Sequence, residues 1–153
     1  MPAAKKIVGV IGGSSCSPEI YELARQVGMN IAQRDAILIC GGLGGVMEAA
    51  CHGVKEAGGL TIGILPGTDK REANVYVDIP IVSGIRDARN TIIVRTADGL
   101  IAVSGEYGTL SEIAFAKKFG KPVVSLKSWS VDPTIPQTES AEQAVALLLD
   151  LLK

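Results

Sequence analysis

Short apolar runs alternate along this sequence with longer stretches of helical character, and this alternation constrains the fold more than any other feature. The runs are continuously apolar rather than alternating, which is typical of strands covered on both faces, as in a parallel sheet. The predicted strands are 6–11, 36–40, 60–65, 100–104 and 122–126, with a weaker one at 79–82.

Helical patterns fill the intervals between these runs. Ser17-Pro18-Glu19 is typical of a helix start, because Ser caps, Pro suits the first turn and an acid favours the positive helix end. The predicted helices cover about 18–33, about 45–57, about 85–97, 109–119 and about 140–153. Two segments are predicted to be loops, 128–139 and 66–78; the latter carries Lys70 and Arg71 and is a candidate cover of a site. This order predicts one α/β domain over 1–153, with a Rossmann-like, doubly wound, mainly parallel sheet and helices on both faces.

Composition excludes several function classes. With 153 residues, 15 Lys plus Arg and 16 Asp plus Glu, the chain has a net charge of -1. Such a chain has no bulk electrostatic reason to bind nucleic acid or an anionic membrane, although the net charge does not exclude a local cluster of basic residues. No apolar run approaches the ~20 residues that span a membrane. Three cysteines without secretory features lead us to expect reduced thiols and a cytoplasmic protein.

Glycines gather at three strand-to-helix turns. In an open parallel sheet these turns share the carboxyl edge, where ligands bind, and each following helix offers free N–H groups to an anion. Such turns also need glycine for purely structural reasons, but three together favour a phosphate or similar anion. The first turn lacks the G-x-G-x-x-G pattern, which disfavours ordinary NAD binding. The glycines are Gly12 and Gly13, then Gly41, Gly42, Gly44 and Gly45, then Gly105 and Gly108.

One arginine stands out in the predicted helix at 85–97. Helical periodicity predicts an inner apolar stripe there, and Arg89 falls in its middle. A charge in that position needs either an ion-pair partner, for which Glu112 is the candidate, or a ligand. Arg86, one turn earlier, is expected at the surface or the rim. The residues of the predicted stripe are Ile85, Ala88, Ile92 and Ile93.

Glu112 has two interpretations that the sequence leaves open. Thr109 and Glu112 have the spacing of a capping box at a helix start. Alternatively, Glu112 is a carboxylate held where it acts on a bound sugar.

The remaining reactive side chains carry weaker signals. His52 is the only histidine, and we expect it to be an ordinary helix residue. Cys16 precedes a helix start, which lowers thiol pKa values, but a reactive thiol is the less favoured interpretation. Cys40, Cys51 and His52 lack the spacing of a zinc site, so we expect no metal site.

The glycine loops, Arg89-Asn90 and the segment Ser104-Gly105-Glu106-Tyr107-Gly108-Thr109-x-x-Glu112 together resemble the LOG (Lonely Guy) superfamily, often mislabelled as lysine decarboxylases. The resemblance covers about residues 6–126. Enzymes of the LOG type hydrolyse the N-glycosidic bond of cytokinin nucleoside monophosphates, and the resemblance implies Arg89 and Glu112 as their catalytic pair. The ligand-binding residues it implies are Gly12, Gly13, Ser14, Ser15, Gly42, Gly44, Gly45, Met47, Asn90, Gly105, Gly108 and Thr109.

A second branch of the superfamily, the molybdenum-cofactor carrier proteins and bacterial relatives, is more similar still. The short chain, Ala88-Arg89-Asn90 and the form of 107–112 match that branch better. Three positions depart from the enzyme pattern: Ser104 replaces a proline, Glu106 the second motif glycine and Asn90 a lysine. A carboxylate beside a phosphate is unfavourable unless it points away or pairs with a cation.

These features favour a protein that binds a phosphorylated nucleotide or molybdopterin-type ligand, for which it would serve as a carrier, with no required cofactor. The alternative is a nucleoside 5'-monophosphate phosphoribohydrolase using Arg89 and Glu112. A structural role without a ligand is a third hypothesis. Lysine decarboxylation is disfavoured because no lysine that could bind pyridoxal phosphate is evident in the three loops. Val94 opposite the predicted stripe, and Ile93 at its edge, add apolar surface. We therefore expect a homo-oligomer, a dimer or tetramer by resemblance.

Overall fold

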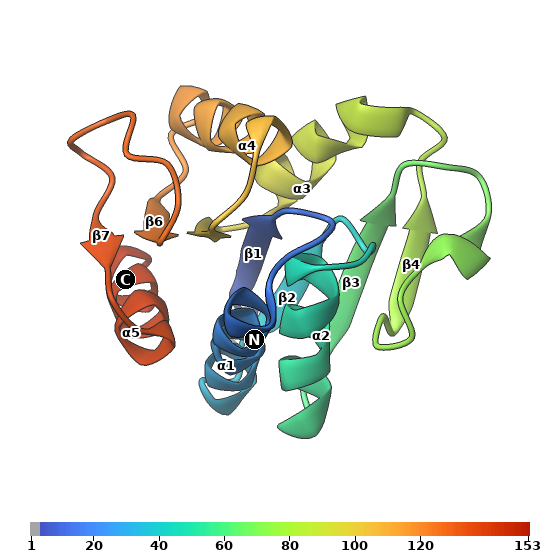
Figure 1. Cartoon of the computed structure of the whole chain (residues 1–153), viewed down its shortest axis with the longest axis horizontal. Helices are drawn as coiled ribbons and strands as arrows, with labels where there is room; N and C mark the ends of the chain where they lie inside the picture. Colours follow the sequence, from blue (N-terminus) through green and yellow to red (C-terminus); the bar gives the residue numbers. More distant parts are fainter. Residues whose placement is uncertain (1–3) are drawn as a thin grey trace.

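In the computed structural model, which describes residues 4–153, the strands form one seven-stranded sheet in the order β4-β3-β2-β1-β5-β6-β7. Every neighbouring pair is parallel, which confirms the predicted fold class (Figure 1). The strands are β1 Ile7–Gly12, β2 Ile37–Cys40, β3 Thr61–Leu65, β4 Ile79–Val82, β5 Gly99–Val103, β6 Val123–Leu126 and β7 Gln137–Thr138.

Helices cover both faces of the sheet. One face carries α1, α2 and α5, and the other carries α3 and α4 (Figure 1). In β5, Ile101 and Val103 face the first layer, whereas Leu100 and Ala102 face the second, so the strand is apolar throughout because it is buried on both sides. The helices are α1 Pro18–Gln33, α2 Val46–Glu56, α3 Asn90–Thr96, α4 Tyr107–Lys118 and α5 Ala141–Leu151.

Local signals positioned several helix ends as predicted. Ser17 Oγ accepts a hydrogen bond from the Ile20 N–H at 3.2 Å, which satisfies one of the free groups at the start of α1. Gly58 and Gly120 follow α2 and α4 with φ values of 75° and 72°, the left-handed conformation that ends a helix most easily with glycine.

The contact between α1 and α2 depends on two glycines inside the helices. A Cβ atom on Gly28 would lie 1.9 Å from the Ala50 carbonyl oxygen, and one on Gly53 would lie 1.8 Å from the Arg25 carbonyl oxygen. The two backbones are therefore too close for any side chain at either position.

The predicted helix at 85–97 is in fact two segments, and three of the four residues of its predicted inner stripe are exposed, while Ile93 and the central Arg89 are buried. Residues Arg86–Arg89 form a 3-10 turn that Arg86 enters with a φ of 54°, and only Asn90–Thr96 are α-helical. Ile85 and Ile92 are 48% and 36% exposed, and Ala88 is also exposed, whereas Ile93 and Val94 are fully buried. The helix thus turns the face containing Asn90, Ile93 and Val94 towards the sheet.

Two smaller predictions were corrected, and the irregular segment 66–78 was confirmed. The segment 128–139 contains the short strand β7, which pairs with β6. Helix α4 begins at Tyr107 rather than at Thr109. The connection 66–78 contains only the 3-10 turn Lys70–Glu72.

The connection 66–78 is tied down beside β2. Asn74 donates from its backbone to the Gly42 carbonyl and from its side chain to the Leu43 carbonyl, both at 2.9 Å.

Within residues 4–153, none of the helices is long and apolar enough to cross a bilayer.

Candidate functional site

A cavity of about 240 Å³ lies at the carboxyl edge of the sheet, where the turns after β1, β2 and β5 meet the 3-10 turn before α3. Its lining combines backbone of the glycine turns with polar side chains from α3 and α4. Ligands of open parallel sheets bind at this carboxyl edge, so the cavity lies where a ligand site is expected. The predicted site residues that line it are Gly12, Gly13, Ser14, Met47, Arg89, Asn90, Gly108, Thr109 and Glu112.

The other predicted residues lie nearby but outside this cavity. Ser15 and Gly105 line an adjoining hollow beside the start of α1. Gly42, Gly44 and Gly45 line neither space and instead allow the turn after β2 to form. A Cβ atom on Gly45, whose φ is 62°, would lie 2.3 Å from the Gly13 carbonyl oxygen. The first two glycine turns therefore touch backbone to backbone.

Arg89 is held under the sheet edge by hydrogen bonds from one side of its guanidinium. The Arg86 N–H donates to the Pro66 carbonyl at 2.9 Å and anchors the 3-10 turn that brings Arg89 inward. Arg89 Nε donates to the Ile64 carbonyl of β3 at 2.9 Å, and Nη1 donates to Asn90 Oδ1. Its Nη2 lies over Gly41, at 2.8 Å from where a Cβ would be. Burial leaves Arg89 only 8% exposed and lowers its pKa.

Glu112 is equally buried and has no partner. It is 7% exposed, and no described residue forms a hydrogen bond or ion pair with its carboxyl group. Burial raises its pKa to about 8, and the Arg89 charge offsets this only in part. The two charged groups therefore line one cavity without forming the ion pair that the sequence left open. The capping box is also wrong, because Thr109 lies inside α4.

Helices α2 and α4 begin without a side-chain cap, but only α4 begins at the cavity with its first N–H groups free, because the first N–H of α2, on Val46, donates to the Gly13 carbonyl at 3.0 Å. Ser17 and Ser140 cap α1 and α5, but Gly45 and Glu106, which precede α2 and α4, make no such hydrogen bond. No described group accepts from the N–H of Gly108, which lines the cavity. Uncapped helix starts provide N–H donors and a positive dipole end, which together suit an anion.

The cavity also holds two acids that the sequence analysis did not assign to binding. Asp87, in the 3-10 turn, was missed entirely, since an acid in a predicted surface helix is normally solvated. Glu106 was recognised only as a departure from the enzyme pattern. Both side chains are exposed, and neither has a hydrogen bond or ion pair with a described residue.

The weaker candidates lie outside the cavity. Burial raises the pKa of the Cys16 thiol, and the Glu48 charge adds to that effect, so the helix start does not activate this thiol. Cys40 and Cys51 are buried, with their Sγ atoms 3.5 Å apart. Among residues 4–153, no group of three or more His, Cys, Asp and Glu side chains is arranged to hold a metal ion.

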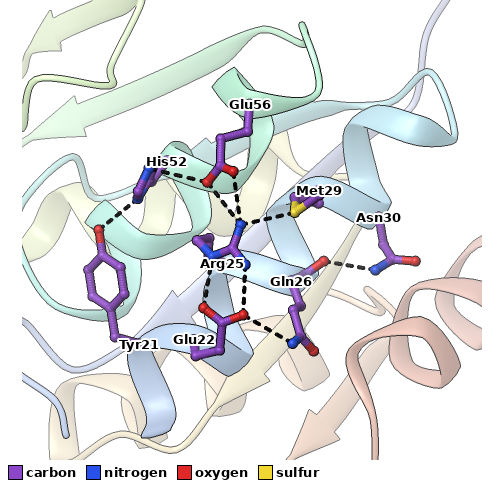
Figure 2. Close-up of polar contacts among 8 residues, drawn as sticks. All are labelled: Tyr21, Glu22, Arg25, Gln26, Met29, Asn30, His52 and Glu56. Carbon is purple, nitrogen blue, oxygen red and sulfur yellow. Dashed lines mark hydrogen bonds and ion pairs between the residues drawn. The ribbon is translucent and has the colours of Figure 1, made fainter. Parts of the chain in front are cut away.

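His52 belongs to a polar cluster between α1 and α2 (Figure 2). Its Nδ1 lies 3.1 Å from the Tyr21 hydroxyl and its Nε2 lies 3.2 Å from Glu56, which also pairs with Arg25. The ring stacks on Tyr76 with centroids 4.4 Å apart. These contacts join two helices, as expected for a structural histidine.

Comparison with known proteins identifies the family. A profile of the SLOG cluster4 family matches residues 5–150. The chain belongs to the SLOG cluster4 family. The cytokinin riboside 5'-monophosphate phosphoribohydrolase of Mycobacterium tuberculosis is 33% identical to this SLOG cluster4 protein over 121 residues, which are 72% of this chain. The matched region is 64% of that enzyme, so the chain spans less than two thirds of its length.

Two solved structures share the fold of this SLOG cluster4 protein over almost its whole length. The molybdenum cofactor binding protein of Rippkaea orientalis matches with a TM-score of 0.93 and 36% identity, covering 99% of this chain and 100% of that one. The molybdenum cofactor carrier protein of Chlamydomonas reinhardtii matches with a TM-score of 0.86 and 37% identity, covering 97% and 99%. Together with the family match, these similarities confirm the predicted resemblance to the LOG superfamily and its carrier-like branch.

Proposed function

We propose that this protein binds a phosphorylated nucleotide or molybdopterin-type small molecule in the cavity of Arg89 and Glu112, and serves as its carrier. The observation that carries the proposal is that both charged groups are buried in one cavity but are not paired with each other. Arg89 donates only to one carbonyl and one amide oxygen, and Glu112 has no hydrogen-bond or ion-pair partner among residues 4–153, so a ligand that bonds to both groups would compensate the cost of burying them.

The start of α4 supports a phosphate as the anionic part of that ligand. The start of α4, where the Gly108 N–H has no acceptor, and the Arg89 guanidinium would hold phosphate oxygens, and Thr109 also lines the cavity. The ring system would then occupy the rest of the cavity. A molybdopterin-type cargo fits this donor set through its phosphate, and similarity to two molybdenum cofactor proteins supports that choice.

Gly108→Ala offers a sharp test. A Cβ atom there would meet no atom within 4 Å, and the residue lies at the start of α4 in the cavity. The variant should keep or slightly gain stability, by up to about 1 kcal/mol, while the methyl group displaces a ligand phosphate. We expect calorimetric titration with GMP to show binding that weakens at least about tenfold in the variant. Equal affinity in both proteins contradicts the placement of the phosphate at the start of α4, and failure of GMP, other nucleoside monophosphates and a phosphorylated pterin to bind contradicts the proposed function.

A second function, cleavage of the N-glycosidic bond of nucleoside monophosphates, is favoured by the state of Glu112. Because burial raises its pKa to about 8, this carboxyl group is mostly protonated at neutral pH and can donate a proton to a departing base. Arg89 would hold the phosphate or assist departure of the base. Similarity to a phosphoribohydrolase supports this alternative.

Incubation with a panel of nucleoside monophosphates, followed by chromatography, separates the two functions. Release of free base that Glu112→Gln abolishes would establish hydrolysis. Binding without release from any substrate leaves the carrier function, for which a rise in melting temperature with a phosphorylated pterin is the next measurement.

We also propose a homo-oligomer, on different residues from those the sequence suggested. Val94 is buried, but the edge strand β4 and the outer side of α3 expose an apolar patch that one chain leaves uncovered. Analytical ultracentrifugation at micromolar concentration should show a dimer or tetramer that Ile85→Glu dissociates; a stable monomer contradicts this proposal. The exposed apolar residues on the α3 side are Ile79 and Ile81 of β4 with Ile85 and Ile92, each 36–48% exposed.

A further inference from the structure

Two consecutive side chains that follow β6 bond to the turn 104–106, which leads into α4. Ser128 Oγ donates to the Ser104 carbonyl at 2.6 Å, and Trp129 Nε1 donates to the Glu106 carbonyl at 3.1 Å. The two donors belong to a loop to which the sequence gave no role, and neither of them lines the cavity. The turn before α4 is therefore held by side chains that lie outside the site.

This turn needs support from elsewhere in the chain because its own backbone is in an unfavourable conformation. Ser104 has a φ of 50° and Gly105 a φ of 106°, and a positive φ is uncommon for any residue other than glycine. No side chain caps the start of α4 either. Local preferences alone do not fix such a turn, so the surrounding structure has to select its conformation.

The two bonded carbonyl groups determine where the next N–H groups point. Across a trans peptide bond, the carbonyl and the following N–H point in opposite directions. The bond to the Ser104 carbonyl thus turns the Gly105 N–H away from the loop, and the bond to the Glu106 carbonyl does the same for the Tyr107 N–H. The Glu106 carbonyl also accepts the first hydrogen bond of α4, from the Leu110 N–H at 3.0 Å. The Tyr107 N–H therefore points out of the open end of the helix.

The N–H groups around this turn are free to bind an anion. Among residues 4–153, no group accepts from the backbone N–H of any of the five residues 105–109. Successive free N–H groups of this kind form a concave anion site. Three of these residues, Glu106, Gly108 and Thr109, line the cavity. The buried, unpartnered Glu112 on the same cavity wall independently marks the space as a ligand site.

Resting on the proposed binding function, we propose that Trp129 and Ser128 are positioning residues, which aim the backbone N–H groups at the start of α4 towards the phosphate of the ligand. They act from the opposite side of the turn, through the peptide groups that they bond. The Trp129 ring packs on the apolar cluster between the sheet and helices α3 and α4, so its donor is in place before a ligand arrives.

Calorimetric titration of Trp129→Phe with GMP and with inorganic phosphate tests this proposal. The variant keeps an aromatic ring but loses the donor, so both affinities should fall by about three- to tenfold, the range of one hydrogen bond. Ser128→Ala removes the other bond and should weaken both ligands in the same way. Lys117→Met is the matched control, because it removes a bond of 2.8 Å from α4 to Thr134 of the same loop, away from the cavity. Its affinities should equal those of the wild type.

A second measurement reports on the Trp129 bond itself. Trp129 is the only tryptophan of the chain, so its indole N–H gives a single resonance in the NMR spectrum of the isotope-labelled protein. A phosphate that accepts from the Tyr107 N–H polarises the peptide group whose carbonyl accepts from the indole, which strengthens that bond. Titration with GMP should therefore move the indole proton resonance downfield, with the same Kd as calorimetry. A loop that only packs against α4 would not give this response.

The outcomes separate this inference from the proposed function. Unchanged affinities in Trp129→Phe and Ser128→Ala overturn the positioning role while leaving binding intact, and so does an indole resonance that saturating GMP does not move. An equal loss of affinity in Lys117→Met would mean that any loosening of the loop has the same effect, and also overturns it. If Trp129→Phe does not fold, Ser128→Ala and the indole resonance decide. Failure of the wild type to bind any phosphorylated ligand refutes the proposed function itself, and the positioning role with it.

Discussion

Replacing Glu112 by glutamine should stabilise the protein increasingly as pH rises. Glu112 is 7% exposed, and burial raises its pKa from 4.5 to about 8. The fold therefore favours the protonated carboxyl group, whereas the unfolded chain releases its proton near pH 4.5. Between these values each pH unit costs the folded wild type about 1.4 kcal/mol. Glutamine keeps the shape of the neutral group and does not titrate, so the Glu112→Gln variant avoids this cost.

The expected difference in the free energy of unfolding, variant minus wild type, is near zero at pH 4.5. It should reach about 3 kcal/mol at pH 7 and level off at about 5 kcal/mol above pH 8. Urea denaturation of both proteins at intervals from pH 4.5 to 9 measures it, with the exposed Glu139→Gln as a control for a carboxylate away from the cavity. Parallel stability curves for Glu112→Gln and wild type would refute the argument that Glu112 is buried without adequate compensation.

Three further substitutions test other parts of the structure. Arg89→Met should abolish GMP binding in calorimetry, and unchanged binding would exclude Arg89 from the site. The variant should also lower the free energy of unfolding by roughly 1–3 kcal/mol, because the Ile64 carbonyl loses its hydrogen-bond donor. Gly28→Ala should destabilise by about 2 kcal/mol or more in thermal unfolding, since its Cβ would lie 1.9 Å from the Ala50 carbonyl oxygen, and a stable variant would mean that α1 and α2 separate easily. Val94→Ala should cost about 2 kcal/mol in urea denaturation because Val94 is fully buried, whereas a cost below about 0.5 kcal/mol is typical of a surface position.

The sheet could be predicted from the sequence because its strands are short, apolar on both faces and separated by clear helix signals. The segment 85–97 could not, since it is apolar on two sides. Ile85, Ala88 and Ile92 share one helical face, Val94 lies opposite and Ile93 lies between them, and periodicity alone cannot decide which side faces the sheet. The 3-10 turn at Arg86–Arg89 and the positive φ of Arg86 decide the orientation, and neither has a clear sequence signal.

The site could be predicted in outline but not in detail. Glycine turns at one sheet edge and a charge in an apolar helix indicated where a ligand would bind, and Arg89 and Glu112 do line a common cavity. Which glycines line it and which only shape the turns depends on backbone approach. Gly13 faces the cavity, whereas Gly45 is required by its contact with Gly13. The sequence alone gives no such distances.

The cost of Glu112 also bears on whether the protein has a ligand at all. A purely structural domain would be more stable at neutral pH with glutamine or an apolar residue at this position, by about 3 kcal/mol for glutamine. That is a large fraction of the 5–15 kcal/mol by which typical domains are stable. Destabilising groups of this kind are characteristic of functional sites, where stability is exchanged for binding or catalysis. The hydrolase would use the neutral, buried carboxyl group as a proton donor, and the carrier would give it a ligand as partner, whereas a role without a ligand leaves its presence unexplained.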